Sequence, residues 1–272
     1  MLRALAAPVL AGVVSLAATL PLWASADDLA RVLKLNEVVD ILHEEGLDYA
    51  DSIENEMLPG GGGAFWEQII LQLYDKAAME QALAATLATD MTPAQISESL
   101  AFFDTEQGQT ILSFENAARA AMSDPDIEDI ARAAYVDLRD TGDARLDQID
   151  RFVVANDLIE RNVAGALSSQ FQFLRGLAEG GAFVMSEDDI LADVYGQEPE
   201  IRADTEEWLF GFLLMAYQPL SDEAMEAYIA FSATDGGKAL NAALFEGFEM
   251  MYRDISYGLG LAAARAMTGS DL

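Results

Sequence analysis

The side chains of this chain that could do chemistry are almost all carboxylates. Its 272 residues include 47 Asp and Glu, 15 Lys and Arg, one histidine and no cysteine, for a formal net charge of −32. Without cysteine the chain has no disulfide, no thiolate nucleophile and no thiolate metal ligand. The histidine, His43, lacks the second histidine of the zinc-protease helix motif. Its place just before Gly46 favours a core histidine or one at the end of a helix.

Carboxylates alone could support two activities. A hydrolase of the glycosidase kind needs an acid with a raised pKa in a cleft and a second acid about 5 to 9.5 Å away. Calcium binding needs several oxygen ligands, and residues 124–129 and 140–147 are rich in them. Neither segment has the glycine at position six or the acid at position twelve of an EF-hand loop. An acid-residue hydrolase and weak divalent-cation binding remain alternatives, and the sequence assigns no catalytic residue, cofactor or metal site.

The basic residues and the glycines indicate structural roles. Five arginines lie within residues 132–161, and we expect them to pair with neighbouring acids and hold a central helix in place. They are Arg132, Arg139, Arg145, Arg151 and Arg161. The glycines at positions 60–63 lack the lysine of a phosphate-binding loop, so they predict a connector between helices. The strong negative charge argues against nucleic acid as a partner.

The N-terminus predicts export. Arg3 precedes an apolar run that ends in Ala24-Ser25-Ala26, which is the pattern of a secretory signal peptide over residues 1–26 with cleavage after Ala26. The most apolar later segment, Trp208 to Tyr217, is much shorter than the roughly 20 residues that a membrane-spanning helix needs. We therefore expect a periplasmic protein without a membrane span after cleavage.

Helical periodicity dominates the rest of the chain, and the alternation typical of strands is missing. Apolar residues recur at spacings of three and four in residues 65–87, 146–177 and 244–266. Thr92-Pro93-Ala94-Gln95 has the residues of a capping box with proline at the first helical position. Residues 208–215 are apolar on all sides, which predicts a buried helix or, alternatively, a hydrophobic groove for a lipid tail or partner helix.

A short motif, Phe-x-x-Thr-x-x-Gly, occurs twice. The first copy is Phe102, Thr105 and Gly108 in the segment TPAQISESLAFFDTEQGQTIL, which starts at Thr92. The second is Phe231, Thr234 and Gly237 in SDEAMEAYIAFSATDGGKALNA, which starts at Ser221. We expect each copy to be a structural corner, in which Thr caps the second helix and Gly allows a close approach of the first. Ligand contact at the exposed helix start is the alternative reading.

The motif, the signal peptide and the helical pattern together resemble the bacterial domain-of-unknown-function family 2059, with two degenerate copies in this chain. The resemblance covers roughly 30 residues in each copy. Phe103 fits the family pattern, whereas Ser232 stands where an aromatic residue is usual. The resemblance implies an exported, mostly helical protein and brings no catalytic residues with it.

These observations predict an all-α protein of two similar, duplicated helical halves packed together. The halves comprise residues 27–123 and 124–272 and follow the signal peptide. A duplication creates a natural cleft, so we expect a non-catalytic envelope protein that binds an unknown protein or an apolar small ligand between the halves. The sequence indicates no oligomeric state.

Overall fold

The structure is a computed structural model that describes residues 25–58 and 60–269, and within these ranges every regular element is an α-helix. The all-α prediction is therefore confirmed. The helices are α1 (Ala26–Val32), α2 (Leu35–Met57), α3 (Gly63–Leu73), α4 (Lys76–Asp90), α5 (Pro93–Phe103), α6 (Glu106–Ala121), α7 (Pro125–Leu138), α8 (Ala144–Asn156), α9 (Leu158–Glu179), α10 (Glu187–Gly196), α11 (Glu198–Tyr217), α12 (Asp222–Ser232) and α13 (Asp235–Thr268).

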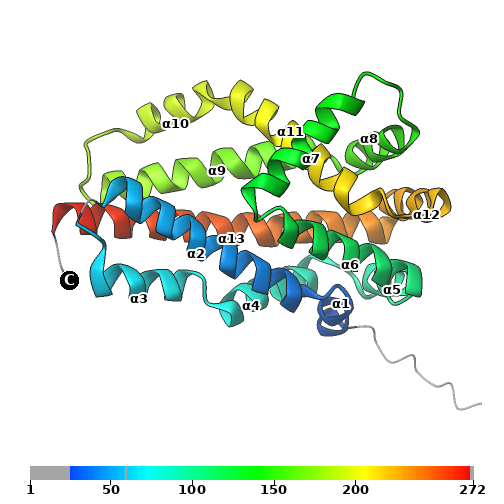
Figure 1. Ribbon diagram of the computed structural model, residues 1–272. Coiled ribbons are helices and arrows are strands. Elements are labelled where there is room, and N and C mark those ends of the chain that lie inside the picture. Colours follow the sequence, from blue (N-terminus) through cyan, green and yellow to red (C-terminus); the bar gives the residue numbers. More distant parts are fainter. Residues whose placement is uncertain (1–24, 59, 270–272) are drawn as a thin grey trace, which may run out of the picture.

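The last helix, α13, runs along most of the molecule, with α9 on one side of it and α3 and α4 on the other (Figure 1). It packs closely against α9, where Gly260 leaves room for the backbone of the neighbouring helix. A Cβ atom at Gly260 would lie 2.1 Å from the carbonyl oxygen of Phe173. Any larger residue at this position would therefore push α9 and α13 apart.

Buried side chains form two separate hydrophobic cores. The first core joins α1 to α5 with most of α13, and Leu83, Leu87 and Leu259 are among its least exposed members. The second core joins α6, α7, α8, α11 and α12, and includes Ile111, Ile149 and Met225. The first core therefore combines α1 to α5 with α13 at the other end of the chain. The second core combines α6 to α8 with α11 and α12.

Two of the segments with helical periodicity are each divided into two helices, for local reasons. The pattern over residues 146–177 divides into α8 and α9 at Asp157, whose φ of 55° is the left-handed conformation that Asp tolerates better than most residues. The pattern over residues 65–87 divides into α3 and α4 at Asp75, whose side chain accepts a hydrogen bond from the backbone N–H of Ala78 at 2.9 Å.

The expectation that His43 lies near a helix end was wrong, because α2 continues past Gly46 to Met57. Gly46 is required inside the helix by packing, since a Cβ atom there would lie 2.1 Å from the ring of Tyr74. His43 reaches the end of α3, where its Nδ1 lies 2.6 Å from the carbonyl oxygen of Tyr74. The histidine thus satisfies a carbonyl that has no partner within its own helix.

The two motif copies form the same kind of corner. Thr105 accepts a hydrogen bond from the N–H of Gly108 at 3.0 Å, and Thr234 accepts one from Gly237 at 3.1 Å. A Cβ atom at Gly108 would lie 2.5 Å from the carbonyl oxygen of Phe102, so the preceding helix ends directly against each glycine. The corners also contact each other, because the rings of Phe102 and Phe231 stack with centroids 4.4 Å apart. This contact between the copies was not apparent from the sequence.

The predicted signal peptide lies outside the described residues, except for Ser25 and Ala26 at the start of α1. Within residues 25–58 and 60–269, none of the helices combines the length and the apolar character needed to cross a bilayer.

Replacing Gly108 with alanine should destabilise the protein, because the new methyl group meets backbone atoms that cannot rotate away. We expect a loss of about 1 to 3 kcal/mol in the free energy of unfolding, measured by urea denaturation. Gly165 in α9 is the matched control, since no atom lies within 4 Å of a Cβ placed there. Gly165→Ala should be neutral or gain up to about 1 kcal/mol. Equal effects of the two substitutions would refute the packing role.

Candidate functional site

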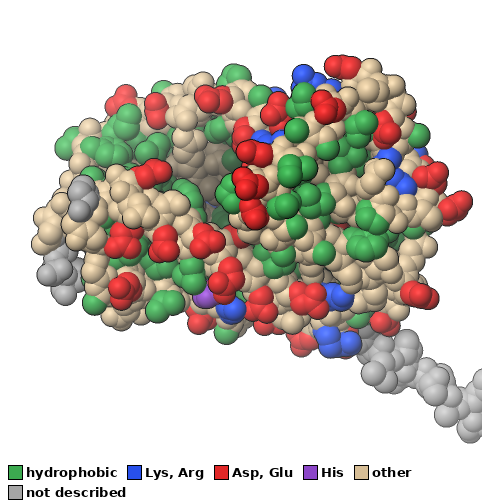
Figure 2. Space-filling view, viewed as in Figure 1, with side chains coloured by type: hydrophobic (Ala, Val, Ile, Leu, Met, Phe, Trp, Pro, Cys, Tyr) green, Lys and Arg blue, Asp and Glu red, His purple; other side chains and the backbone are tan. Residues whose placement is uncertain are grey.

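A cleft opens between the two cores, where α2 faces the end of α6, the start of α7 and the middle of α11. Its volume is about 440 Å³, and it is open to solvent. Figure 2 shows this side of the molecule hollowed, with Asp and Glu side chains along the edges of the hollow. The side chains that line it are Glu45, Asp48, Arg119, Met122, Ser123, Glu128 and Trp208. Since α2 belongs to the first core and the other three helices to the second, the cleft is a boundary between the cores.

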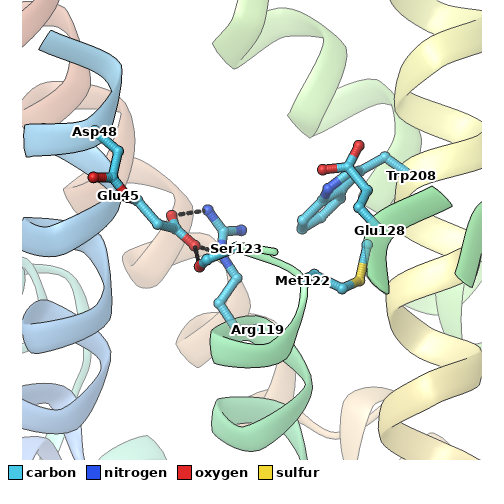
Figure 3. A pocket seen from close by; sticks show the side chains of 7 residues that line it. All are labelled: Glu45, Asp48, Arg119, Met122, Ser123, Glu128 and Trp208. Atoms are coloured by element: carbon cyan, nitrogen blue, oxygen red, sulfur yellow. Dashed lines mark hydrogen bonds and ion pairs between the residues drawn. The ribbon is translucent and has the colours of Figure 1, made fainter. Parts of the chain in front are cut away.

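An ion pair crosses the cleft between Glu45 on α2 and Arg119 on α6 (Figure 3). The Nε and Nη2 atoms of Arg119 donate to the two carboxylate oxygens of Glu45 at 2.7 and 2.6 Å. Ser123 donates a third hydrogen bond to Glu45 at 3.3 Å. Burial by itself would lower the pKa of Arg119, but the hydrogen bonds and charge of Glu45 raise it above its usual value. The arginine is therefore charged and its charge is already compensated.

Trp208 supplies the aromatic wall of the cleft. The guanidinium carbon of Arg119 lies 4.9 Å from the centroid of the Trp208 ring, within the range of a cation–π contact. The ring of Phe212, one turn further along α11, stacks on Trp208 with centroids 5.4 Å apart. The helix around residues 208–215 is buried as its composition suggested, because none of these residues is exposed and Leu209, Phe210, Gly211, Leu213 and Leu214 are buried. Trp208 is one of its partly buried residues.

The remaining carboxylates of the cleft differ in how well they are neutralised. Glu128 accepts a hydrogen bond from Arg132 at 2.7 Å and also adds its charge to the surroundings of Arg119. The exposed carboxylate of Asp48 makes no ion pair in the described part of the chain. Two of the three carboxylates that line the cleft are therefore paired with arginines, Glu45 with Arg119 and Glu128 with Arg132, and Asp48 is the one without an ion pair.

A second cluster lies one turn from Arg119 on the same helix, where Glu115 sits between two tyrosines. Its Oε1 accepts hydrogen bonds from the hydroxyls of Tyr217 at 2.6 Å and Tyr228 at 3.1 Å. Burial raises the pKa of Glu115 to about 7, although both hydrogen bonds act to lower it. The spacing of Glu115 and Arg119 would favour a pair within the helix, but each side chain bonds to another helix instead.

The residues singled out from the sequence lie elsewhere. None of the motif residues Phe102, Thr105, Gly108, Phe231, Thr234 and Gly237 lines the cleft.

Four of the five clustered arginines form ion pairs, in which Arg132 binds Glu128 and Asp204, Arg139 binds Asp140, Arg145 binds Asp222, and Arg151 binds Glu226. The fifth, Arg161, lies over the ring of Phe245 with its guanidinium carbon 5.4 Å from the centroid. The sequence carried no signal for Glu45, Arg119 or Glu115, because their partners are on distant helices.

The alternatives that use carboxylates gain no support from this geometry. In residues 25–58 and 60–269, no group of three or more His, Asp or Glu side chains is arranged to hold a metal ion. The described carboxyl group with a raised pKa, Glu115, has tyrosine hydroxyls as its partners and no second carboxylate. A paired-acid mechanism needs the second carboxylate.

Comparison with known proteins identifies no relative. No model of a protein family matches the chain, and neither a curated protein nor a solved structure is detectably similar to it.

Replacing Glu45 with glutamine should destabilise the protein, because Arg119 would keep its charge without a carboxylate partner. The pair is only partly buried, so we expect a loss of about 1 kcal/mol, well below that of a fully buried pair. Chemical denaturation at low and high salt measures it. Glu44→Gln is the control, since Glu44 is exposed and lies 4.0 Å from Lys76. A loss at Glu44 that matches the loss at Glu45 would contradict the bridging role.

Glu115 should make stability depend on pH. Its pKa in the folded state, about 7, lies above the ordinary 4.5, so the folded protein holds a proton that the unfolded chain releases between these values. This group therefore favours folding fully below about pH 4.5, and its contribution falls as the pH rises towards 7. Glu115→Gln keeps an oxygen for both tyrosines but cannot ionise.

We expect the stability of the variant relative to wild type to increase between pH 4.5 and 7, by on the order of 1 to 3 kcal/mol. Denaturant unfolding across this pH range measures it. Glu67→Gln, at an exposed position on α3, is the control and should follow wild type. A constant difference between Glu115→Gln and wild type over the range would show that Glu115 titrates normally.

Proposed function

We propose that this chain is a non-catalytic binding protein of the bacterial envelope that holds a small amphipathic ligand in the cleft between its two cores. The observation that carries the proposal is the cleft itself, which combines an aromatic wall at Trp208 with charged side chains from both cores. Its volume of about 440 Å³ lies within the usual range of small-molecule sites. A partner protein that inserts a side chain between the cores is the other occupant that this geometry would accept.

A duplication of one helical unit is also part of the proposal. Two features of the described chain support it. The only non-glycine residues with positive φ in the described ranges, Lys34 at 56° and Asp157 at 55°, each join a short helix to a long one, α1 to α2 and α8 to α9. Each long helix is followed by two further helices and then by one copy of the motif. The cores do not coincide with the two halves, because α6 of residues 27–123 contributes to the second core and α13 of residues 124–272 to the first. The cleft is nevertheless lined from both halves, since Glu128 and Trp208 belong to the second half and the other lining residues to the first.

The location and the ancestry are also proposals. Export through a signal peptide over residues 1–26 rests on the sequence pattern, as does the resemblance to the domain-of-unknown-function family 2059. A chain without cysteine folds independently of the redox state of its compartment, which is compatible with export.

Filling the cleft should abolish ligand retention. In Ser123→Phe the new ring would occupy space between Arg119, Glu45 and Trp208. We expect native mass spectrometry of the wild-type protein, purified from the periplasm without denaturation, to show a bound small molecule that this variant lacks. Thr110→Phe is the control, since Thr110 is exposed on α6, the helix that ends just before Ser123. Retention of the same molecule by both variants, or a wild-type protein without any ligand, would contradict the proposal.

A further inference from the structure

We propose that two copies of this chain join by exchanging their first five helices, with the corner between α5 and α6 as the hinge. The interaction surface is the face of α13 that covers α1 to α5, and the partner is a second copy of the chain. This inference goes beyond the proposed function and does not depend on a ligand in the cleft.

Helices α1 to α5 bury their apolar side chains against a helix from the other end of the chain. α13 packs on α3, α4 and α5, and its Leu259 lies in the same core as Leu83 and Leu87. One connection, Asp104 and Thr105, joins the five helices to α6 and the rest of the chain. The five helices therefore need an α13 to cover their apolar face, and the α13 of another copy would make the same contacts.

The two motif copies already exchange their second helices within one chain. Ile111, three residues after Gly108, is buried in the second core. Leu240, three residues after Gly237, is buried in the first core. Each motif copy thus sends its second helix, α6 or α13, into the core to which the first helix of the other copy contributes.

The hydrogen bonds of the two corners cross in the same way. The N–H of Gly236, directly before the second motif glycine, donates to the carboxylate of Glu98 on α5 at 2.6 Å. The side-chain amide of Gln107, directly before the first motif glycine, donates to the carbonyl oxygen of Ala224 on α12 at 3.5 Å. Since both corners bond to the other copy, the exchange is reciprocal, as it is between the subunits of a dimer that swaps helices.

A single residue with extended backbone separates α5 from α6. Thr105 has φ −91° and ψ 159°, whereas Asp104 before it has φ −80° and ψ 11°, which is close to the helical region. Turning ψ of Thr105 into the helical range would make α5 and α6 one helix and carry α1 to α5 away from their own α13. Contacts released between α2 and α6 include polar ones that water can replace, such as Lys34 with Ser113 at 2.8 Å.

An opened chain exposes the apolar face of its first five helices, which favours pairing with a second opened chain. In the pair, each set of five helices packs on the α13 of the other chain, so only the two corners differ from the single chain. The cleft forms twice in the pair, with Glu45 from one chain and Arg119 from the other.

Refolding at different concentrations tests whether the chains pair. The protein is unfolded in urea and refolded at about 1 µM or at about 1 mM, the effective concentration typical of a short connection. Size-exclusion chromatography with light scattering should show single chains at the low concentration and a dimer in addition at the high one. The dimer should persist after dilution, because its return to single chains requires the first core to open.

The spectrum of the dimer distinguishes exchange from ordinary association. Its ¹H–¹⁵N spectrum should match that of the single chain except around residues 102–108, because all other contacts are kept. A dimer that dissociates at once on dilution, with signals changed on a surface away from the corner, would overturn the proposal.

Variants of the corner test the hinge. Gly108→Ala strains the closed corner, and Thr105→Ala removes its cap, whereas alanine suits a continuous helix at both positions. We expect each variant to lower the refolding concentration that gives half dimer at least tenfold. Thr105→Ala keeps the test decisive if Gly108→Ala does not fold.

Gly211→Ala is the matched control. A Cβ atom there would lie 3.0 Å from the backbone of Ala131, and both residues are on the same side of the hinge, so the strain is equal in the single chain and the dimer. Its half-dimer concentration should stay within about twofold of wild type. An equal shift in Gly211→Ala and Thr105→Ala, or no dimer of wild type or Thr105→Ala at any concentration, would overturn the proposal.

Discussion

The ion pair between Glu45 and Arg119 is the contact on which the account of the site depends. It joins α2 of the first core to α6, whose second half belongs to the second core, so it crosses the boundary at the point where the two cores separate. It also sets the charge of the cleft, because an arginine bound by two nitrogens to one carboxylate no longer attracts anions. The guanidinium of Arg119 also makes a cation–π contact with Trp208, which holds the indole ring at the wall of the cleft.

The second core is stabilised by polar contacts as well as by apolar burial. Glu115 connects α6 to α11 and α12 through two tyrosine hydroxyls, and no cation neutralises it. Burying a carboxyl group in this way favours its protonated form. The stability of the second core near neutral pH therefore depends on whether Glu115 is protonated. Glu115 lies one helical turn from Arg119 on α6. The high negative charge of the chain is otherwise a property of its surface.

The sequence predicted local structure well and the site poorly, for physical reasons. The helix start at Thr92 was visible because a capping residue acts on its own next turn. The break at Asp157 was missed because the apolar pattern continues across it and only the left-handed backbone interrupts the helix. Glu45 and Arg119 could not be selected among many similar residues, since their roles arise from contacts between helices that are distant in the chain, whereas Trp208 lies in a segment for which a hydrophobic groove was one of the two alternatives. The burial of the segment around Trp208 was predicted correctly, because a helix that is apolar on all sides is stable only where its neighbours cover it.

The central claim is that the cleft beside Arg119 holds a ligand, and the indole N–H signal of Trp208 in a ¹H–¹⁵N spectrum tests it most directly. The mature protein, purified without denaturation, is compared with the same protein after unfolding, removal of small molecules and refolding, which the absence of cysteine makes straightforward. The account predicts that the Trp208 signal moves between the two samples while that of Trp66, buried in the first core, stays in place. A Trp208 signal that is identical in both samples would contradict it.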